Sequence, residues 1–219
     1  TYGLSPNADV RAQNIIVKNQ KMNFDVSYNN KINDKPYMIK NISFSMLGLH
    51  NIQNALASIS IALELKIKPT IIKLALEKFN GVQRRFQFIN TYKNTQIIDD
   101  YGHHPEEIKA ALSATKLIGD KSKVLAVFQP HRYSRLKNHF NEFCSCFNDA
   151  DEVVLLNVYA AGEKKIANCN NIDLENGIRN YGHKKVSSVT NDEDIYKTIL
   201  KKINNYQIII FLGAGNITK

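Results

Sequence analysis

The sequence predicts an α/β protein in which a mostly parallel sheet follows a smaller part built from β-hairpins and two helices. Two observations support this prediction. From residue 87 onward, apolar runs typical of buried strands alternate with helical patterns, an order that gives parallel strands joined by right-handed crossovers. Before residue 80, strand-like runs come first and helical patterns follow. The turn "NGVQRR" separates the two patterns, so we expect a domain boundary that divides the chain into 1–80 and 81–219.

The first part is expected to open with hairpins, because short apolar runs alternate with polar turns in "NIIVKNQKMNFDVSYNN" and "KPYMIKNISFSM". The Asn-rich segment "VSYNNKIN" is typical of a hairpin turn. From "LGLHN" onward the apolar residues recur with a helical period as far as Leu65. Pro69 helps to open a second helix that reaches Phe79.

The second part begins with "FQFINTYKNTQIIDD", which predicts a hairpin ending in a buried strand. Pro105 followed by two glutamates predicts a helix start, because proline suits the first turn and acidic residues favour its positive end. Three further strands are predicted at "KVLAVFQP", "DEVVLLNVY" and "QIIIFLGAG", and a weak one at "KVSSV". Helical patterns separate them: the apolar stripe Leu136, Phe140, Phe143 and Phe147, the segment "LENGIRNY", and residues 192–204.

Composition is that of an ordinary globular protein, with 43% hydrophobic and 22% charged residues over 219 positions. The net charge of +9 could indicate nucleic-acid binding, but the lysine pairs are scattered and no basic stripe carries interleaved aromatics. We expect no nucleic-acid partner, only a preference for small anions such as nucleotides. No apolar run approaches the roughly 20 residues that span a bilayer, so no membrane association is expected.

The three cysteines form no paired framework, which predicts reduced thiols and a cytoplasmic location. Cys144 and Cys146 fall two residues apart in a helical pattern and would point away from each other. A zinc site is therefore not expected there.

Four polar loops carry most of the unusual residues. "DDYGHHP", "QPHRYSR", "NVYAAGE" and "GAGN" each follow a predicted parallel strand. In open α/β sheets the carboxyl ends of the strands form the edge where ligands bind. Four such loops on one edge predict a binding site there.

Each cluster also has a structural interpretation. His103 and His104 are either displayed at the sheet edge or serve to cap and pack the helix that starts at Pro105. A metal site is disfavoured, since adjacent residues seldom both reach one ion. In "HRYSR", His131, Arg132 and Arg135 either form an anion clamp or a solvated charge run. In "GLHNIQN", Asn51 and Asn54 either cap a helix or read the edge of an adenine.

Seven stretches together resemble the Mur ligase family: "TYGLSPNADVRAQNI", "GLHNIQNALASISIA", "GVQRRFQ", "DDYGHHPEEI", "FQPHRYSRL", "VYAAGE" and "GAGNI". They occur in the family's order and cover essentially the whole chain. "DDYGHHP" together with "FQPHRYSR" is similar to the alanine-adding branch of the family. The alternative within the family is the branch that recycles murein tripeptide.

The resemblance implies a Rossmann-like C-terminal Mur ligase domain over 81–219, preceded by the last part of the central ATPase domain over 1–80. It also implies a ligase that uses ATP and Mg²⁺ to join L-alanine to UDP-N-acetylmuramate through an acyl phosphate, in peptidoglycan precursor synthesis. Residue by residue, it implies that the adenine lies against Asn51 and Asn54. The rest of the nucleotide is expected at Arg85, Asp100 and Tyr101.

The amino-acid end of the site is implied to comprise His103, His131, Arg132 and Arg135. His103 would either accept a proton from the amine or orient the substrate. A charged partner for the alanine carboxylate is expected among the two arginines.

The sequence departs from the family pattern in containing no G-x-x-x-x-G-K-[ST] phosphate loop. The UDP-binding domain and the magnesium ligands are likewise expected elsewhere, and "TYGLSPNADV" does not look like a natural start. We therefore expect a fragment that is inactive alone, with apolar surface exposed around residues 1–80 and the missing N-terminal half as a partner. The rival interpretation is a non-catalytic nucleotide-binding or interaction module.

Overall fold

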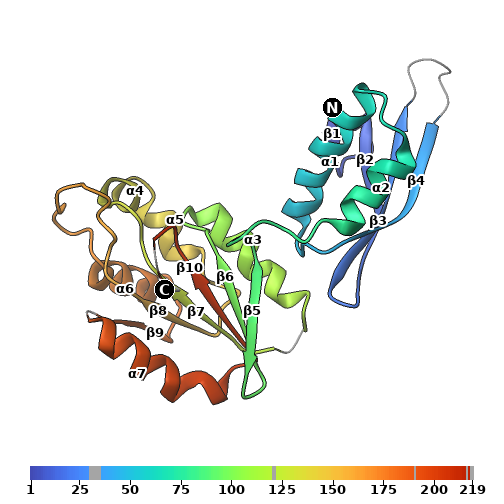
Figure 1. Cartoon of the computed structure of the whole chain (residues 1–219). Coiled ribbons are helices and arrows are strands. Elements are labelled where there is room, and N and C mark those ends of the chain that lie inside the picture. The colour runs from blue at the N-terminus through green and yellow to red at the C-terminus, as the bar shows by residue number, and fades with distance from the viewer. Residues whose placement is uncertain (30–35, 120–121, 190, 216, 218–219) are drawn as a thin grey trace. The chain divides into compact units, whose positions relative to one another are not determined.

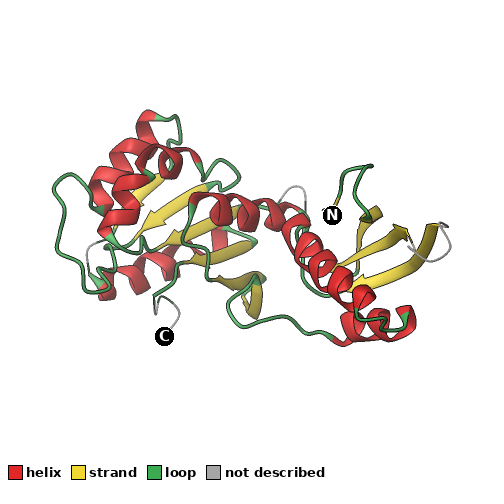
Figure 2. Ribbon diagram, turned by 90° about the horizontal axis from the view of Figure 1, so that it is seen from above, coloured by secondary structure: helices red, strands yellow, loops and turns green. Residues whose placement is uncertain are grey.

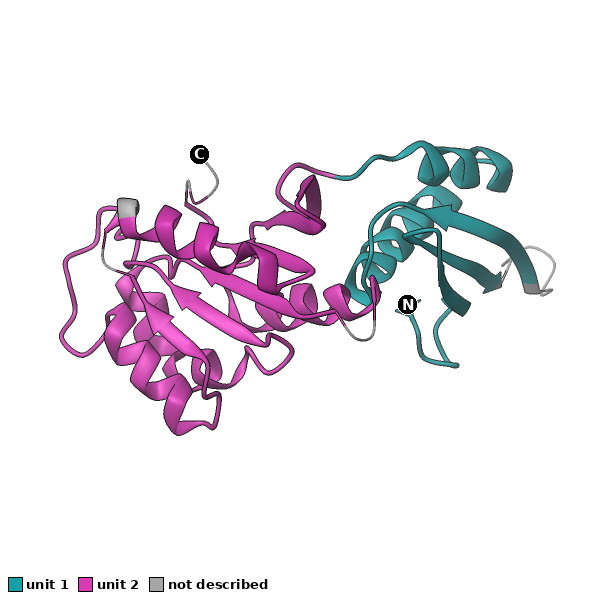
Figure 3. Cartoon of the chain, turned by 90° about the horizontal axis from the view of Figure 1, so that it is seen from below, with its two compact units in different colours: residues 1–81 teal, residues 82–219 magenta. Residues whose placement is uncertain are grey.

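The computed structural model describes residues 1–29, 36–119, 122–189, 191–215 and 217. Its helices and strands follow one another in the order labelled in Figure 1, and Figure 2 distinguishes the two kinds of element by colour. The chain divides into two compact units, Thr1–Gly81 and Val82–Lys219, called here the smaller and the larger unit (Figure 3). The division falls next to the predicted boundary at residue 80. That the smaller unit is the end of a central ATPase domain stays a prediction.

The smaller unit consists of a four-stranded sheet and two helices. The sheet has the order β1-β2-β3-β4, in which β1 runs parallel to β2 and the other neighbours are antiparallel. The strands are β1 (Tyr2–Gly3), β2 (Val10–Lys18), β3 (Lys21–Asn29) and β4 (Pro36–Phe44), and the helices are α1 (Leu49–Glu64) and α2 (Pro69–Lys78). The second half of the predicted hairpin turn "VSYNNKIN", residues 30–33, lies outside the described part of the chain.

One face of this sheet packs against apolar side chains of the helices. Alternate residues of β3, among them Met22, Phe24 and Val26, are buried, as expected for a strand with one covered face. Ile52 and Leu56 of α1 are fully buried as well, whereas Ile72 is the one buried residue recorded for α2. Several large apolar side chains of this unit remain exposed in the described structure: Leu49, Ile61, Leu65, Ile71 and Leu74.

The larger unit is built on a six-stranded sheet with the order β5-β6-β10-β7-β8-β9. Every neighbouring pair is parallel except β5 and β6, which form the predicted antiparallel hairpin. The mostly parallel sheet predicted from the sequence is therefore confirmed. Its strands are β5 (Gln87–Tyr92), β6 (Thr95–Asp100), β7 (Val124–Phe128), β8 (Glu152–Leu155), β9 (Val186–Ser188) and β10 (Ile208–Leu212).

Helices cover both faces of this sheet, as Figure 2 shows. The central strand β7 is buried along its whole length, with Val124, Ala126 and Phe128 in one core and Leu125 and Val127 in the other. This period-two division explains why the strand reads as a continuous apolar run. The first core is completed by α3 (Pro105–Lys116), α4 (Tyr133–Asn138), α5 (Phe140–Ser145) and α6 (Asn171–Asn180), and the second by α7 (Asp192–Lys202) and the short 3₁₀ helix Ile203–Asn205.

The apolar stripe from Leu136 to Phe147 does not lie on one helix. The chain leaves the helical conformation at His139, where φ is −121° and ψ is 28°, so that α4 ends and α5 begins. The ring of His139 packs edge-on against that of His104, with centroids 4.6 Å apart. Leu136, Phe143 and Phe147 nevertheless all lie in the first core, so the break does not expose these three side chains.

Within the described residues, no helix is long and apolar enough to cross a membrane.

Candidate functional site

The four polar loops of the larger unit lie at one edge of its sheet. Leu212, the last residue of β10, pairs in register with Asp100 at the end of β6 and with Phe128 at the end of β7. The loops continue these contacts: the Gly213 amide donates to the Asp100 carbonyl over 3.1 Å, and the Gln129 amide donates to the Leu212 carbonyl over 3.0 Å. The strand order changes direction at β10, which is the position where parallel α/β sheets open a crevice.

Asp100 is buried at the centre of this edge, with 5% of its surface exposed. Its Oδ1 accepts a hydrogen bond from the Gly102 amide over 2.6 Å, and its Oδ2 accepts one from the Phe86 amide over 2.7 Å. Burial raises the pKa of Asp100 above its ordinary value, although these two hydrogen bonds and the charge of Arg85 act in the opposite direction. The carboxylate thus joins the segment before β5 to the loop after β6.

Arg84, the neighbour of Arg85 in "GVQRRFQ", is a further member of the site, although no role was predicted for it. Its Nε donates to Asp99 Oδ2 over 3.2 Å, and its Nη2 donates to the Gly213 carbonyl. The guanidinium also lies over the Tyr101 ring, 5.2 Å from the centroid. Arg84 and Phe86 both have positive φ, of 58° and 48°, so this turn holds a backbone conformation that non-glycine residues rarely adopt. One side chain therefore ties together three segments of the edge.

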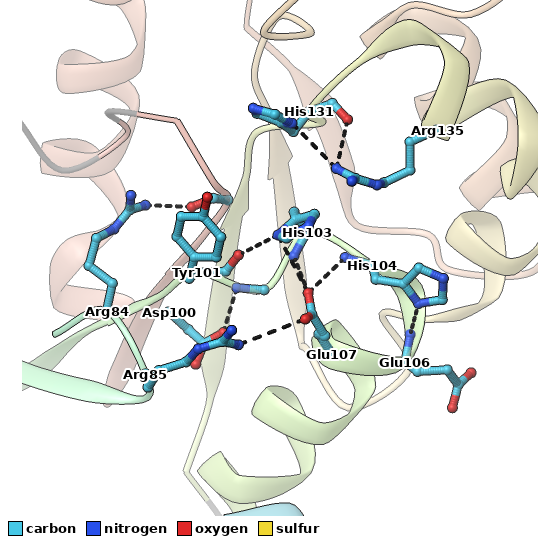
Figure 4. A network of polar contacts seen from close by, with 12 residues as sticks. Arg84, Arg85, Asp100, Tyr101, His103, His104, Glu106, Glu107, His131 and Arg135 are labelled. Carbon is cyan, nitrogen blue, oxygen red and sulfur yellow. Dashed lines mark hydrogen bonds and ion pairs between the residues drawn. The ribbon is translucent and has the colours of Figure 1, made fainter. Parts of the chain in front are cut away.

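Arg85, the predicted nucleotide-binding arginine, is more exposed than Arg84. Its side chain is 46% exposed, against 25% for Arg84. It lies 5.6 Å from the centroid of the Tyr101 ring, and its Nη1 is 3.8 Å from Oε1 of Glu107 (Figure 4). Arg85 and Tyr101 therefore leave a charged and an aromatic surface accessible beside the buried Asp100.

Glu107 lies between this group and the histidines. Its Oε2 accepts hydrogen bonds from the amides of His103, over 3.0 Å, and His104, over 3.2 Å. The ring of His103 is also close, with Nδ1 3.5 Å from the same oxygen and 2.9 Å from the Tyr101 carbonyl. Burial alone would raise the pKa of Glu107, but the His103 amide and charge, the His104 amide and Arg85 hold it below its ordinary value.

His104 caps the helix α3. Its Nδ1 accepts from the Glu106 amide over 3.4 Å, and it forms the N-cap of α3 in a capping box completed by Glu107. The structural alternative considered for this histidine is confirmed.

His131 and Arg135 lie near His103 (Figure 4). The rings of His103 and His131 have centroids 5.9 Å apart, and Arg135 Nη1 lies 3.3 Å from both the Nδ1 and the carbonyl oxygen of His131. The His131 ring also stacks on that of Tyr159, with the centroids 5.3 Å apart. Burial lowers the pKa of His131 below its ordinary value, and the charges of Arg135 and His103 add to that effect. The structure thus brings together three of the four residues that were predicted to form the amino-acid end of the site.

The fourth, Arg132, takes part mainly through its backbone. It is the N-cap residue of α4 with a φ of 70°, and its amide donates to the Tyr159 carbonyl over 2.9 Å. Its side chain is exposed at the same loop. Glu163, the last residue of "NVYAAGE" but not one of the predicted site residues, accepts from the amide and the hydroxyl of Ser134 and so fixes the loop after β8 against the start of α4.

Asn51 and Asn54 belong to the smaller unit rather than to this network. Asn51 is buried, and its Nδ2 donates to the Leu47 carbonyl over 2.7 Å. Asn54 is exposed one turn further along α1, with its Nδ2 3.5 Å from Oδ1 of Asn51. Of the two amides, that of Asn54 is the accessible one.

The described side chains include no group of three or more His, Cys, Asp or Glu residues placed to hold a metal ion. The three cysteines carry free thiols and are buried.

Known proteins resemble this chain in sequence and in fold. The sequence profile of the family described as Mur ligase, glutamate ligase domain, matches residues 84–215. The UDP-N-acetylmuramate–L-alanine ligase of Bartonella tribocorum is 43% identical over 219 residues, which are all of this chain and 46% of that protein. The ligase of the same name from Gluconobacter oxydans is 42% identical over the same length, again with 46% of that protein covered.

Among solved structures, a UDP-N-acetylmuramate–alanine ligase from Thermotoga maritima matches with a TM-score of 0.79 and 26% identity, over 99% of this chain and 45% of that one. This likeness confirms the fold implied by the sequence motifs. The present chain spans less than half the length of the curated relatives that it matches. Since the family profile alone covers more than half of its residues, the chain belongs to the Mur ligase family.

Proposed function

We propose that this chain forms part of an ATP-dependent ligase that joins L-alanine to the lactyl carboxylate of UDP-N-acetylmuramate through an acyl phosphate, in peptidoglycan precursor synthesis. The observation that supports this most is the convergence of His103, His131 and Arg135 beside Asp100 and Arg85 at one sheet edge. A ligase of this kind must hold a small amino acid next to a nucleotide, and this edge offers suitable groups for both. The relatives named above carry the corresponding activity in their names.

The nucleotide end is assigned to Arg85, Asp100 and Tyr101. The exposed guanidinium of Arg85 suits a phosphate, which it can contact by two parallel hydrogen bonds. Each oxygen of Asp100 accepts one backbone hydrogen bond and keeps a second acceptor position, so the carboxylate can also accept from the ribose hydroxyls. Of the two asparagines, Asn54 reads the adenine edge, and the buried Asn51 holds it in place.

The amino-acid end is assigned to the group of His103, His131, Arg132 and Arg135. Arg135 provides the fixed positive charge for the alanine carboxylate, with Arg132 at the rim of the same loop. His131 is kept neutral by its lowered pKa, so it orients Arg135 without adding a second charge. A hydrogen bond between the Arg135 guanidinium and the alanine carboxylate would contribute about 1.5–3 kcal/mol.

In such a ligase, phosphoryl transfer from ATP would activate the carboxylate, and a bound Mg²⁺ would supply neutralisation of the developing charge. We assign the magnesium ligands and the phosphate loop to residues outside this sequence, which would form the N-terminal half of the ligase and act in the cytoplasm. By itself, the 219-residue chain is then expected to form no amide bond.

A hybrid enzyme tests this proposal. In it, the 219-residue sequence replaces the matching 46% of the Bartonella tribocorum ligase, and phosphate release is followed with ATP and UDP-N-acetylmuramate. We expect release that depends on L-alanine. A hybrid that folds but releases phosphate with murein tripeptide in place of L-alanine would overturn the assignment in favour of the recycling branch. A folded hybrid that releases none would favour a non-catalytic module.

A further inference from the structure

Glu107 does more than cap a helix. A capping box requires its carboxylate to accept only the backbone amide of His104, yet the same oxygen also accepts the amide of His103 and lies 3.5 Å from that residue's ring nitrogen Nδ1. The neighbouring Glu106, in contrast, is paired with Lys109 and has a side chain that is 71% exposed. Figure 4 shows Glu107 between His103 and Arg85, with Glu106 directed away from them.

The surroundings of Nδ1 determine which nitrogen of the His103 ring carries the proton. Nδ1 lies 2.9 Å from the Tyr101 carbonyl oxygen, which can only accept a hydrogen bond. The second close group, the Glu107 carboxylate, is held ionised by its lowered pKa and is also an acceptor. Two acceptors at one nitrogen require that nitrogen to be the donor. In the neutral ring, Nε2 is then the unprotonated nitrogen.

We infer that Glu107 is a positioning residue which, with the Tyr101 carbonyl, holds His103 as its Nδ1–H tautomer and so presents Nε2 as the proton acceptor of the site. This inference rests on the proposed function for the identity of the proton donor, the ammonium group of L-alanine. One N–H bond of the ammonium breaks and an Nε2–H bond forms, which leaves a neutral amine able to attack and an imidazolium beside the Glu107 carboxylate. The positive charge therefore moves from the substrate to a ring that already faces an anion.

The other charged groups around His103 are consistent with this role. Arg85 contacts Oε1 of Glu107 at 3.8 Å, so Oε2 is the oxygen directed at the histidine. The ring of His131 lies 5.9 Å from that of His103, between centroids; its lowered pKa keeps it neutral, and Arg135 contacts its Nδ1. Among these groups, Glu107 alone can offset a positive charge on His103.

The test is ¹⁵N NMR of the histidine rings in the 219-residue chain, which reports the tautomer directly and needs no catalytic activity. We expect the neutral ring of His103 to carry its proton on Nδ1. Glu107→Gln keeps an acceptor for the helix cap but removes the charge, so we expect a larger fraction of the Nε2–H tautomer. Glu106→Gln, the matched control one residue earlier, should leave the His103 signals as in the wild type.

A wild-type His103 protonated on Nε2 would overturn the inference, and this holds even if the Glu107 variant does not fold. If the tautomer populations of His103 were unchanged in a folded Glu107→Gln chain, Glu107 would not be the residue that fixes the tautomer. In the hybrid ligase, the same variant should lower kcat by about tenfold or more, a part of the roughly 10²–10⁴ that positioned acid–base groups supply, with little change in the KM for ATP. An inactive hybrid with the expected tautomer would count against the proposed function alone.

Discussion

The variant Arg135→Ala removes the positive charge that is proposed to bind the carboxylate of the substrate L-alanine. It removes few other interactions. Among the described residues the Arg135 guanidinium makes two contacts, both to His131 and both at 3.3 Å, near the long limit for a hydrogen bond. Its contribution to the fold is therefore small, and we expect the melting temperature of the variant to stay close to that of the wild type. The effect on substrate binding is expected to be much larger.

The size of that effect follows from the bond that is lost. A hydrogen bond to a charged group contributes about 1.5–3 kcal/mol, which corresponds to roughly a tenfold to hundredfold loss in kcat/KM for L-alanine. The KM for ATP should change little, because Arg135 is assigned to the amino-acid end. Arg135→Lys should recover only part of the loss, since an ammonium keeps the charge but not the two-point geometry.

Steady-state kinetics of the hybrid ligase, with L-alanine and ATP varied in turn, measures kcat/KM for L-alanine and the KM for ATP. Lys137→Ala is the matched control, because Lys137 is an exposed cation on the same helix α4. An unchanged KM for alanine in Arg135→Ala would remove this residue from the clamp. An equal loss in Lys137→Ala would show that only the overall charge of the loop matters.

Three further perturbations test other parts of the site. Asp100→Asn should raise the KM for ATP by about tenfold or more and leave the KM for alanine nearly unchanged; the reverse pattern would move Asp100 to the amino-acid end. Arg84→Ala should lower the free energy of unfolding by about 1–3 kcal/mol, because its bonds to Asp99 and the Gly213 carbonyl are lost, whereas the exposed Arg85→Ala should cost less than about 1 kcal/mol; equal losses in urea denaturation would contradict this. Because the pKa of His131 is lowered in the folded state, the unfolded chain takes up a proton first as the pH falls below about 6.5, so stability should decline there. That decline should be smaller in His131→Gln, and an identical pH dependence would show that His131 does not contribute.

The regular elements of the larger unit were predictable because local pattern and tertiary environment agree. The run "VLAVF" is buried on both faces in β7, and Pro105 begins α3 as its position predicts. The break at His139 was not predictable from the spacing of Leu136 and Phe143, since both residues face the core with or without it. Helical periodicity reports which side of a segment is buried, but not whether the helix is continuous.

The site was predictable only in part, for a related reason. His103, His131 and Arg135 follow the ends of strands, so the sheet topology alone brings them close together. Arg84 and Glu107 contribute through bonds to backbone groups that are distant in sequence or hidden in a turn, such as the Gly213 carbonyl and the His103 amide. Nothing in a single sequence marks such partners. The left-handed backbone of Arg84 is equally invisible, because arginine is not a residue that favours it.

A crystal structure of the hybrid ligase with a non-hydrolysable ATP analogue and L-alanine tests the proposed site most directly. We expect the alanine carboxylate about 3 Å from the Arg135 guanidinium, the amine facing Nε2 of His103, and the nucleotide against Arg85 and Asp100. Alanine bound away from the His103, His131 and Arg135 side chains, or a nucleotide that does not approach Asp100, would contradict the proposal that this sheet edge holds both substrates.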